Sequence, residues 1–190
     1  KSINEIIKRH EVLRTVFKAN DGQTVQVVLP ALTIKISIVN IRWAASEEAR
    51  QAEIHRRYRD EAHRAFDLAH GPLLRVTLLR LAEDENVLLL AIHHMIFDGW
   101  SRGILARELS AFYAGLIGGN PFPLRELSTQ YVDFALAQER WLQGENLQAQ
   151  LLFWKRQLEN VPMLQLPTDR PRPAVQSSNG ARQRLMISET

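Results

Sequence analysis

The stretch from Val87 to Ser101 constrains the fold more than any other part of the chain. Its first six residues are all apolar, which is too short a run to span a membrane and is typical of a fully buried strand. His93 and His94 follow directly, and Asp98 and Gly99 come soon after them. The stretch therefore predicts a strand, a turn at Asp98-Gly99 and then a helix, which is a common rigid support for reactive groups.

The two histidines are expected to have different roles. Side chains alternate between the faces of a strand. If the strand continues through the pair, His94 shares a face with Leu88, Leu90 and Ile92, and His93 points the other way. One imidazole is then a reactive group and the other a structural one.

Composition narrows the class of protein. The chain has 190 residues, 45% of them apolar, which suits one domain with a real core. The net charge is +3 and the arginines form no run, so the pattern does not favour nucleic-acid binding. Cysteine is absent, which excludes disulfides, thiolate nucleophiles and cysteine-based zinc sites, and fits a cytoplasmic protein. The chain begins inside a helical pattern without an initiator Met, so we expect it to be a piece of a longer protein.

Apolar periodicity predicts alternating helices and strands, and hence an α/β fold. The expected helices cover 3–14, 46–65 with Ser46 as N-cap, 100–117, a segment from 131 with Ser128 as N-cap, and 147–158. The expected strands cover 16–17 and 24–28 as a hairpin around Asp21-Gly22, 34–38, 73–81 paired with the central strand, and 183–187. Four prolines over 161–175 predict either an extended linker or a loop that follows the surface.

The chemistry of the His-His-x-x-x-Asp-Gly pattern leaves several roles open. A histidine at a strand end can act as a general base near neutral pH, and backbone N–H groups at the following helix start can stabilise an oxyanion. The same pair can be structural. It can also suggest a metal site with Asp98, although adjacent strand residues point apart. For Asp98 itself, an N-cap or a salt-bridge anchor is preferred to catalysis. Arg75 lies in an apolar strand and needs a carboxylate partner if it is buried, but a position on a sheet edge or a solvent-facing side would explain it equally well.

Several separated segments resemble the condensation domains of nonribosomal peptide synthetases. The first is similar to the family pattern R-H-E-x-L-R-T-x-F, the second to H-H-x-x-x-D-G and the third to Y-x-D-F-A. They are Arg9–Phe17, His93–Gly99 and Tyr131–Ala135, and two minor signs are Phe66–Leu68 with Gly71–Arg75 and Leu166–Pro173. The segments stand in the family's order and span essentially the whole chain.

This resemblance implies a fold and a reaction. The fold would be a chloramphenicol acetyltransferase-like lobe, a mixed β-sheet packed with helices. Residues 1–175 would be the N-terminal lobe, truncated at its start, and 176–190 would begin the crossover to a missing C-terminal lobe. The reaction would be amide formation between a carrier-tethered donor thioester and a carrier-tethered aminoacyl acceptor, in a tunnel between the lobes. The isolated chain would then be inactive.

The resemblance also assigns roles to particular residues. His94 matches the residue central to catalysis, as base or as a group that positions the amine and stabilises the intermediate. Gly99 matches the position whose small size and backbone N–H shape the site. His93 and Asp98 match structural residues. Possible salt-bridge partners of Asp98 are Arg9, Arg14 and Arg75.

Partners and alternatives follow from the same resemblance. No cofactor or metal would be bound, because phosphopantetheine arrives on upstream and downstream carrier proteins, and an adenylation domain would be a neighbour. The residues after Gly99 do not fit epimerisation relatives, the intact histidine pair does not fit cyclisation relatives, and Glu11 favours an L-configured donor. Two other functions remain open. One is a non-catalytic lobe that recognises carrier proteins or tailoring enzymes, and the other is a stand-alone acyltransferase that uses coenzyme A thioesters.

Overall fold

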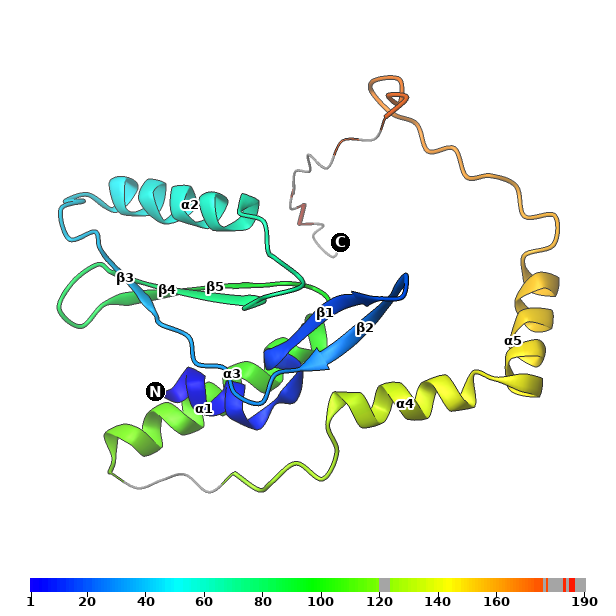
Figure 1. Ribbon diagram of the computed structural model, residues 1–190. Helices are drawn as coiled ribbons and strands as arrows, with labels where there is room; N and C mark the ends of the chain where they lie inside the picture. Colours follow the sequence, from blue (N-terminus) through cyan, green and yellow to red (C-terminus); the bar gives the residue numbers. More distant parts are fainter. Residues whose placement is uncertain (120–123, 176, 178–182, 184, 187–190) are drawn as a thin grey trace. The chain divides into compact units, whose positions relative to one another are not determined.

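The computed structural model describes residues 1–119, 124–175, 177, 183, 185 and 186 (Figure 1). The chain falls into two units, Lys1–Leu142 and Gln143–Thr190. The first unit contains all the described strands and four of the α-helices. The second contains helix α5 (Gly144–Gln157) and the proline-rich segment.

A mixed three-stranded sheet lies at the centre of the first unit. Its strands are β3 (Ser37–Asn40), β4 (Leu74–Arg80) and β5 (Asn86–Ile92), in that order. Strand β3 is parallel to β4, and β4 is antiparallel to β5. This arrangement confirms the predicted hairpin between the last two strands and the α/β class.

A separate hairpin precedes the sheet. Strands β1 (Thr15–Asn20) and β2 (Gln23–Val28) pair antiparallel. The two residues of the turn have positive φ, 50° at Asp21 and 77° at Gly22. A two-residue turn of this kind matches the twist of the strands and favours Asp-Gly. The predicted hairpin is therefore confirmed.

Four helices accompany the strands of the first unit. They are α1 (Ser2–Arg9), α2 (Glu47–His63), α3 (Gly99–Ile117) and α4 (Tyr131–Trp141). The Ser46 hydroxyl accepts a hydrogen bond from the backbone N–H of Ala49 at 3.2 Å, which confirms Ser46 as the N-cap of α2. None of the described helices combines the length and the apolar character that crossing a bilayer requires.

Two helix boundaries differ from the sequence prediction. The helix expected over 3–14 ends at Arg9, because His10 adopts an extended backbone (φ −104°, ψ 108°), and the chain continues as a 3-10 turn over Glu11–Arg14. The N-cap of α4 is Gln130 and not Ser128. The backbone N–H of Gln130 donates to the Asp133 carboxylate at 2.9 Å, which closes a capping box that Ser128 cannot form.

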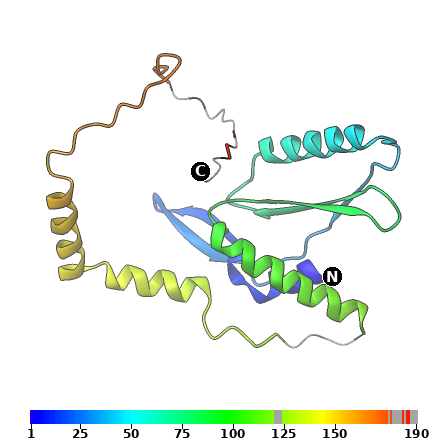
Figure 2. The ribbon, with the colours of Figure 1, turned by 180° about the vertical axis from the view of Figure 1, so that it is seen from behind.

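Helices cover both faces of the sheet. Figures 1 and 2 show α2 along one face and α1 with α3 on the other. Strand β5 serves both faces by alternation: Leu88 and Ile92 pack against the main core, and Val87 and Leu89 pack against a smaller cluster. The buried residues of the main core are Ile3, Ile6, Ile7, Leu13, Ile34, Leu73, Leu74, Val76 and Ile96, and those of the smaller cluster are Ile41, Leu79 and Leu81.

Strand β5 was predicted to be fully buried, and this prediction is wrong. It lies at the edge of the sheet, where no described strand pairs with its outer side. Its apolar residues are mostly half-buried, and Leu90 is 38% exposed. The apolar run of β5 therefore indicates a strand that contacts protein on both faces and has no described neighbour on one edge.

Other apolar patterns also differ in the folded chain. The strand expected over 34–38 starts only at Ser37, because the backbone of Ile34 bonds to the side chain of Asn4 at 3.0 and 3.2 Å. In the stripe of α3, Trp100 is 86% exposed. Residues 161–175 contain no helix or strand, which agrees with the linker or loop that the four prolines predict. Of the strand expected over 183–187, residues 184 and 187 lie outside the described residues, and 183, 185 and 186 are not in a strand.

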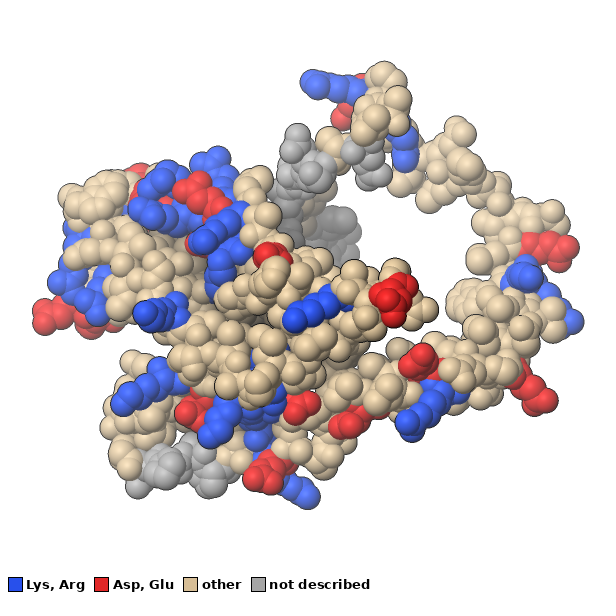
Figure 3. Space-filling model, viewed as in Figure 1, with Lys and Arg blue, Asp and Glu red and all other residues tan. Residues whose placement is uncertain are grey.

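Helix α2 carries interspersed charges of both signs (Figure 3). One of its carboxylates, that of Glu53, is buried and accepts hydrogen bonds from Arg56 at 2.7 and 2.8 Å and from Arg57 at 2.8 Å. The guanidinium of Arg56, and then that of Arg57, lower the pKa of Glu53 from 4.5 to about 2. The folded state therefore favours the ionised form of this carboxyl group.

We expect Glu53→Gln to lower the free energy of unfolding by about 1 kcal/mol at pH 7. Because the pKa of Glu53 is depressed in the folded chain, its contribution is complete above pH 4.5 and is lost as the pH falls towards about 2. Urea unfolding of wild type and variant between pH 7 and pH 3 measures the difference in their free energies of unfolding. The difference between them should shrink below pH 4.5, and a constant difference would contradict the assignment.

Candidate active site

The His-His-x-x-x-Asp-Gly segment forms a turn between β5 and α3. Strand β5 ends at Ile92, and Gly99 is the first residue of α3. The backbone N–H of His93 donates to the Leu73 carbonyl at 2.9 Å, and the N–H of Ile96 donates to the His93 carbonyl at 3.1 Å. Ile96 is buried in the main core, so the turn is anchored at both ends.

The two histidines lie in different environments, as predicted. The predicted cause was strand alternation, but the structure has a turn at this point. The strand does not continue through them, so strand alternation does not separate them. The Nδ1 atom of His93 accepts a hydrogen bond from the backbone N–H of Met95 at 3.2 Å, and the His93 ring packs edge-on to Phe66. His94 is exposed, and none of the described residues donates to or accepts from its side chain. Of the two histidines, His94 therefore has the more solvent-exposed imidazole.

Asp98 caps helix α3. Its carboxylate accepts from the Ser101 backbone N–H at 2.8 Å and from the Ser101 hydroxyl at 2.6 Å. The Ser101 hydroxyl, followed by the Ser101 backbone N–H, lowers the pKa of Asp98, and nearby His94 adds a smaller effect in the same direction. A carboxylate at a helix N-terminus also interacts favourably with the helix dipole. The preferred N-cap role is thus what the structure shows.

The three arginines expected near Asp98 bind elsewhere in this structure. Arg9 Nε bonds to Glu108 Oε1 at 3.2 Å and its NH2 group to the Arg125 carbonyl at 2.6 Å. Arg14 donates to the Leu29 carbonyl and to the Glu11 carboxylate.

Arg75 bonds to the end of α2 and to the Glu61 carboxylate at 2.9 Å. The expected salt bridge to Asp98 is therefore wrong for all three. The physical reason is that Asp98 is satisfied by Ser101 within its own helix turn, and each arginine has nearer acceptors.

Gly99 leaves open space at the start of α3. A Cβ atom built on it would meet no atom within 4 Å, and its φ is not in the left-handed region. Neither backbone strain nor packing by the described residues requires glycine at this position. A requirement for small size would have to come from a substrate or from protein outside the described residues.

Three residues that the sequence analysis did not assign support the site. Phe66 contacts both Arg75 and His93. Glu108 is buried and pairs with Arg9 and with His10 Nε2, the latter at 2.6 Å. A signal for Glu108 was available, because a carboxylate between apolar Leu105 and Phe112 on the buried side of a helix needs a partner.

Gln130 joins the start of α4 to the end of α1. Its side-chain oxygen accepts from the Glu11 backbone N–H at 3.1 Å, and its side-chain nitrogen donates to the Arg9 carbonyl at 3.1 Å. No sequence pattern marks these two hydrogen bonds, because the partners are more than 100 residues apart.

The described part of the chain has no group of three or more His, Cys, Asp or Glu side chains that could hold a metal ion.

Comparison with known proteins identifies the family. The family model "Condensation domain" matches residues 1–190. This chain belongs to the condensation domain family. A linear gramicidin synthase of Brevibacillus parabrevis is 47% identical over 189 residues, and phosphinothricin tripeptide synthetase PhsC of Streptomyces viridochromogenes is 41% identical over 187 residues. The matches cover 99% and 98% of this chain but only 4% and 17% of the two relatives.

Solved structures of the same family share the fold. The X-domain in the complex of X-domain and OxyB from teicoplanin biosynthesis has a TM-score of 0.78, with 29% identity over 92% of this chain and 38% of that one. The epimerization domain from the third module of tyrocidine synthetase B has a TM-score of 0.72, with 27% identity over 88% of this chain and 38% of that one. The expected chloramphenicol acetyltransferase-like fold, with its mixed sheet and helices, is confirmed.

Proposed function

We propose that this chain contributes the catalytic histidine of a domain that forms amide bonds in nonribosomal peptide synthesis. The observation that carries the proposal is the family match over residues 1–190, combined with an intact His-His-x-x-x-Asp-Gly turn in which the His94 side chain is exposed. The relatives are peptide synthetases, and they match this chain at more than 40% identity.

The reaction joins an acceptor amine to a donor thioester. The amine nitrogen attacks the thioester carbonyl, the C–N bond forms, the C–S bond breaks, and the thiol of the donor arm leaves with the proton that the amine loses. His94 either accepts that proton or positions the amine and stabilises the tetrahedral intermediate. At the start of α3 the backbone N–H groups of Trp100 and Ser101 are directed at the Asp98 carboxylate, so the N–H of Gly99 is the one that could donate to a developing oxyanion.

The substrates would arrive on carrier proteins. Phosphopantetheine arms of an upstream and a downstream carrier protein would bring donor and acceptor, and an adenylation domain would lie next to this one in the protein. We further propose that residues 1–175 form the N-terminal lobe and that 176–190 lead towards a C-terminal lobe. The match to only 38% of the solved relatives' chains supports a division of this kind.

A recognition function is the second candidate. The structure with a TM-score of 0.78 is of a family member in complex with another protein, OxyB. A lobe that only docks a partner would need the fold and not the chemistry of His94. The intact motif and the exposed His94 favour catalysis.

One experiment separates these functions. The complete domain that contains this chain is mixed with donor- and acceptor-loaded carrier proteins, and in parallel with the same acyl groups on coenzyme A. We expect dipeptide only from the carrier-bound pair. Binding of both carriers without product would favour recognition, and equal rates from coenzyme A thioesters would favour a stand-alone acyltransferase.

A further inference from the structure

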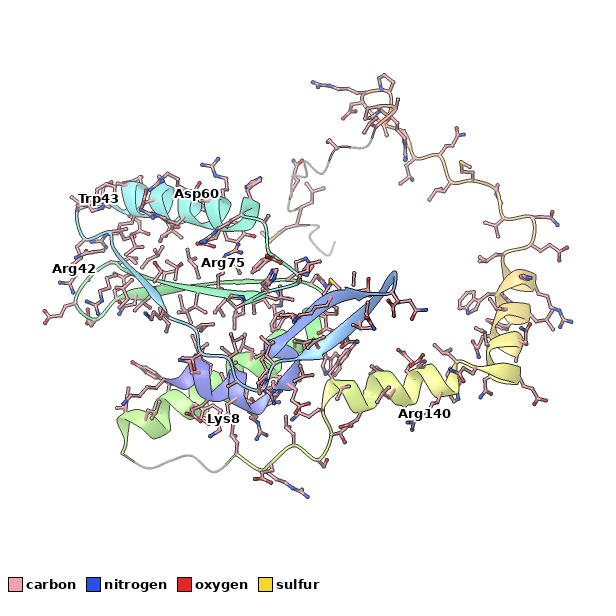
Figure 4. The ribbon with its side chains drawn as sticks, in the orientation of Figure 1. Lys8, Arg42, Trp43, Asp60, Arg75 and Arg140 are labelled. Carbon is pink, nitrogen blue, oxygen red and sulfur yellow. The ribbon has the colours of Figure 1, made fainter. Side chains whose placement is uncertain are left out.

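Arg75 is held in one orientation by its hydrogen bonds. It projects from β4 towards the end of α2 (Figure 4). Its Nε donates to the Glu61 carboxylate at 2.9 Å, and its NH2 group donates to the carbonyls of Glu61 and Arg64 at 3.0 and 2.8 Å. These bonds cap the C-terminal end of α2 and fix the plane of the guanidinium group.

Phe66 lies between this guanidinium and the histidine pair. The Arg75 Cζ atom lies 3.8 Å from the centroid of the Phe66 ring, a cation–π contact. The centroids of the Phe66 and His93 rings are 5.7 Å apart and the rings are inclined by 83°, an edge-to-face contact. Phe66 is half-buried and also packs against the main core, so its ring has little freedom. Phe66 thus contacts both Arg75 and His93.

His93 in turn fixes the turn that carries His94. Its ring Nδ1 accepts from the Met95 backbone N–H, so the proton of the neutral ring is on Nε2. Its backbone carbonyl accepts from Ile96 and its backbone N–H donates to Leu73. His94 lies between these bonded residues, and its direction depends on the turn that they define.

We propose that Phe66 is a positioning residue, which holds the His93 ring so that the turn presents His94 to the reacting amine. This inference rests on the proposed condensation function. It assigns to Phe66 a role in the rate of the chemical step and not in the binding of carrier proteins. Arg75 acts behind Phe66, in place of the salt bridge to Asp98 that the sequence suggested.

The test compares matched variants of the complete domain in single-turnover dipeptide formation. Phe66→Leu removes the ring, and we expect the maximal rate to fall about tenfold, because a small displacement of a reacting group is costly, while the carrier concentrations at half-maximal rate stay unchanged. Phe66→Tyr keeps the ring and should restore most of the rate. The control is Phe17→Leu, the same exchange at another half-buried phenylalanine that packs against the same core.

A double-mutant cycle shows whether Phe66 acts through His93. In His93→Ala the ring that Phe66 holds is gone, so adding Phe66→Leu should slow the reaction no further. The proposal would be overturned if the double variant lost the product of the two single rate losses. It would also be overturned if Phe66→Leu reacted at the wild-type rate. If Phe66→Leu does not fold, Phe66→Met takes its place. A wild-type domain without product would instead refute the proposed function, which keeps the two failures distinct.

Discussion

Replacing His94 by alanine is expected to abolish dipeptide formation and to leave the fold intact. A general base or a group that stabilises an intermediate contributes about 10²–10⁴-fold to a rate. The loss should appear in the chemical step, because His94 is exposed on a turn whose bonds come from His93 and Ile96. Single-turnover rates of the complete domain with loaded carrier proteins measure it.

The control for this experiment is His55→Ala, which removes an exposed histidine from α2, on the opposite face of the sheet from α3 (Figures 1 and 2). Its rate and its unfolding temperature should match those of wild type. Carrier binding should be the same in wild type, His94→Ala and His55→Ala. A His94→Ala domain that still makes dipeptide within a fewfold of the wild-type rate would remove His94 from the mechanism and leave recognition as the better account.

Replacing Glu108 by leucine is expected to destabilise the fold more than replacing Glu53 by glutamine. The Glu108 side chain is only 8% exposed and is paired with Arg9 at 3.2 Å and His10 at 2.6 Å. Removing the Glu108 carboxylate leaves His10 without this partner and Arg9 with the Arg125 carbonyl alone, and we expect this to cost about 3 kcal/mol. Since these contacts join α1 to α3, the loss should appear as a lower free energy of cooperative unfolding in urea.

Two further variants make the result specific. Glu108→Gln keeps the shape and one acceptor oxygen, so we expect a smaller loss than for Glu108→Leu. Glu139→Leu removes an exposed carboxylate from α4 and should change the free energy of unfolding by no more than about 0.5 kcal/mol. Equal losses for Glu108→Leu and Glu139→Leu would show that the buried pair does not stabilise this fold.

Local sequence signals predicted most of the helices, the hairpins and the capping of α2 correctly. The Asp21-Gly22 turn and the Ser46 N-cap depend on residues a few positions apart, whose preferences are set by backbone geometry. The helix start at Gly99 and the N-cap role of Asp98 are of the same kind. For these elements the local preference and the fold agree.

Predictions that depended on distant neighbours were less successful. Strand β5 was expected to be fully buried, and its position at the sheet edge leaves Leu90 partly exposed. The strand expected from residue 34 begins later because Asn4, on α1, binds the backbone of Ile34. Apolar periodicity identifies a face and its period, but it contains no information on which segment covers that face.

The sequence by itself determined the family and the α/β class, and it singled out the histidine pair. It did so through motifs whose residues are adjacent in the chain. Only the tertiary structure decided the partners of Arg9, Arg14 and Arg75, and it placed Phe66 between Arg75 and His93. The physical reason is that a long charged side chain binds whichever acceptors the fold brings within about 3 Å, and sequence separation does not limit that choice.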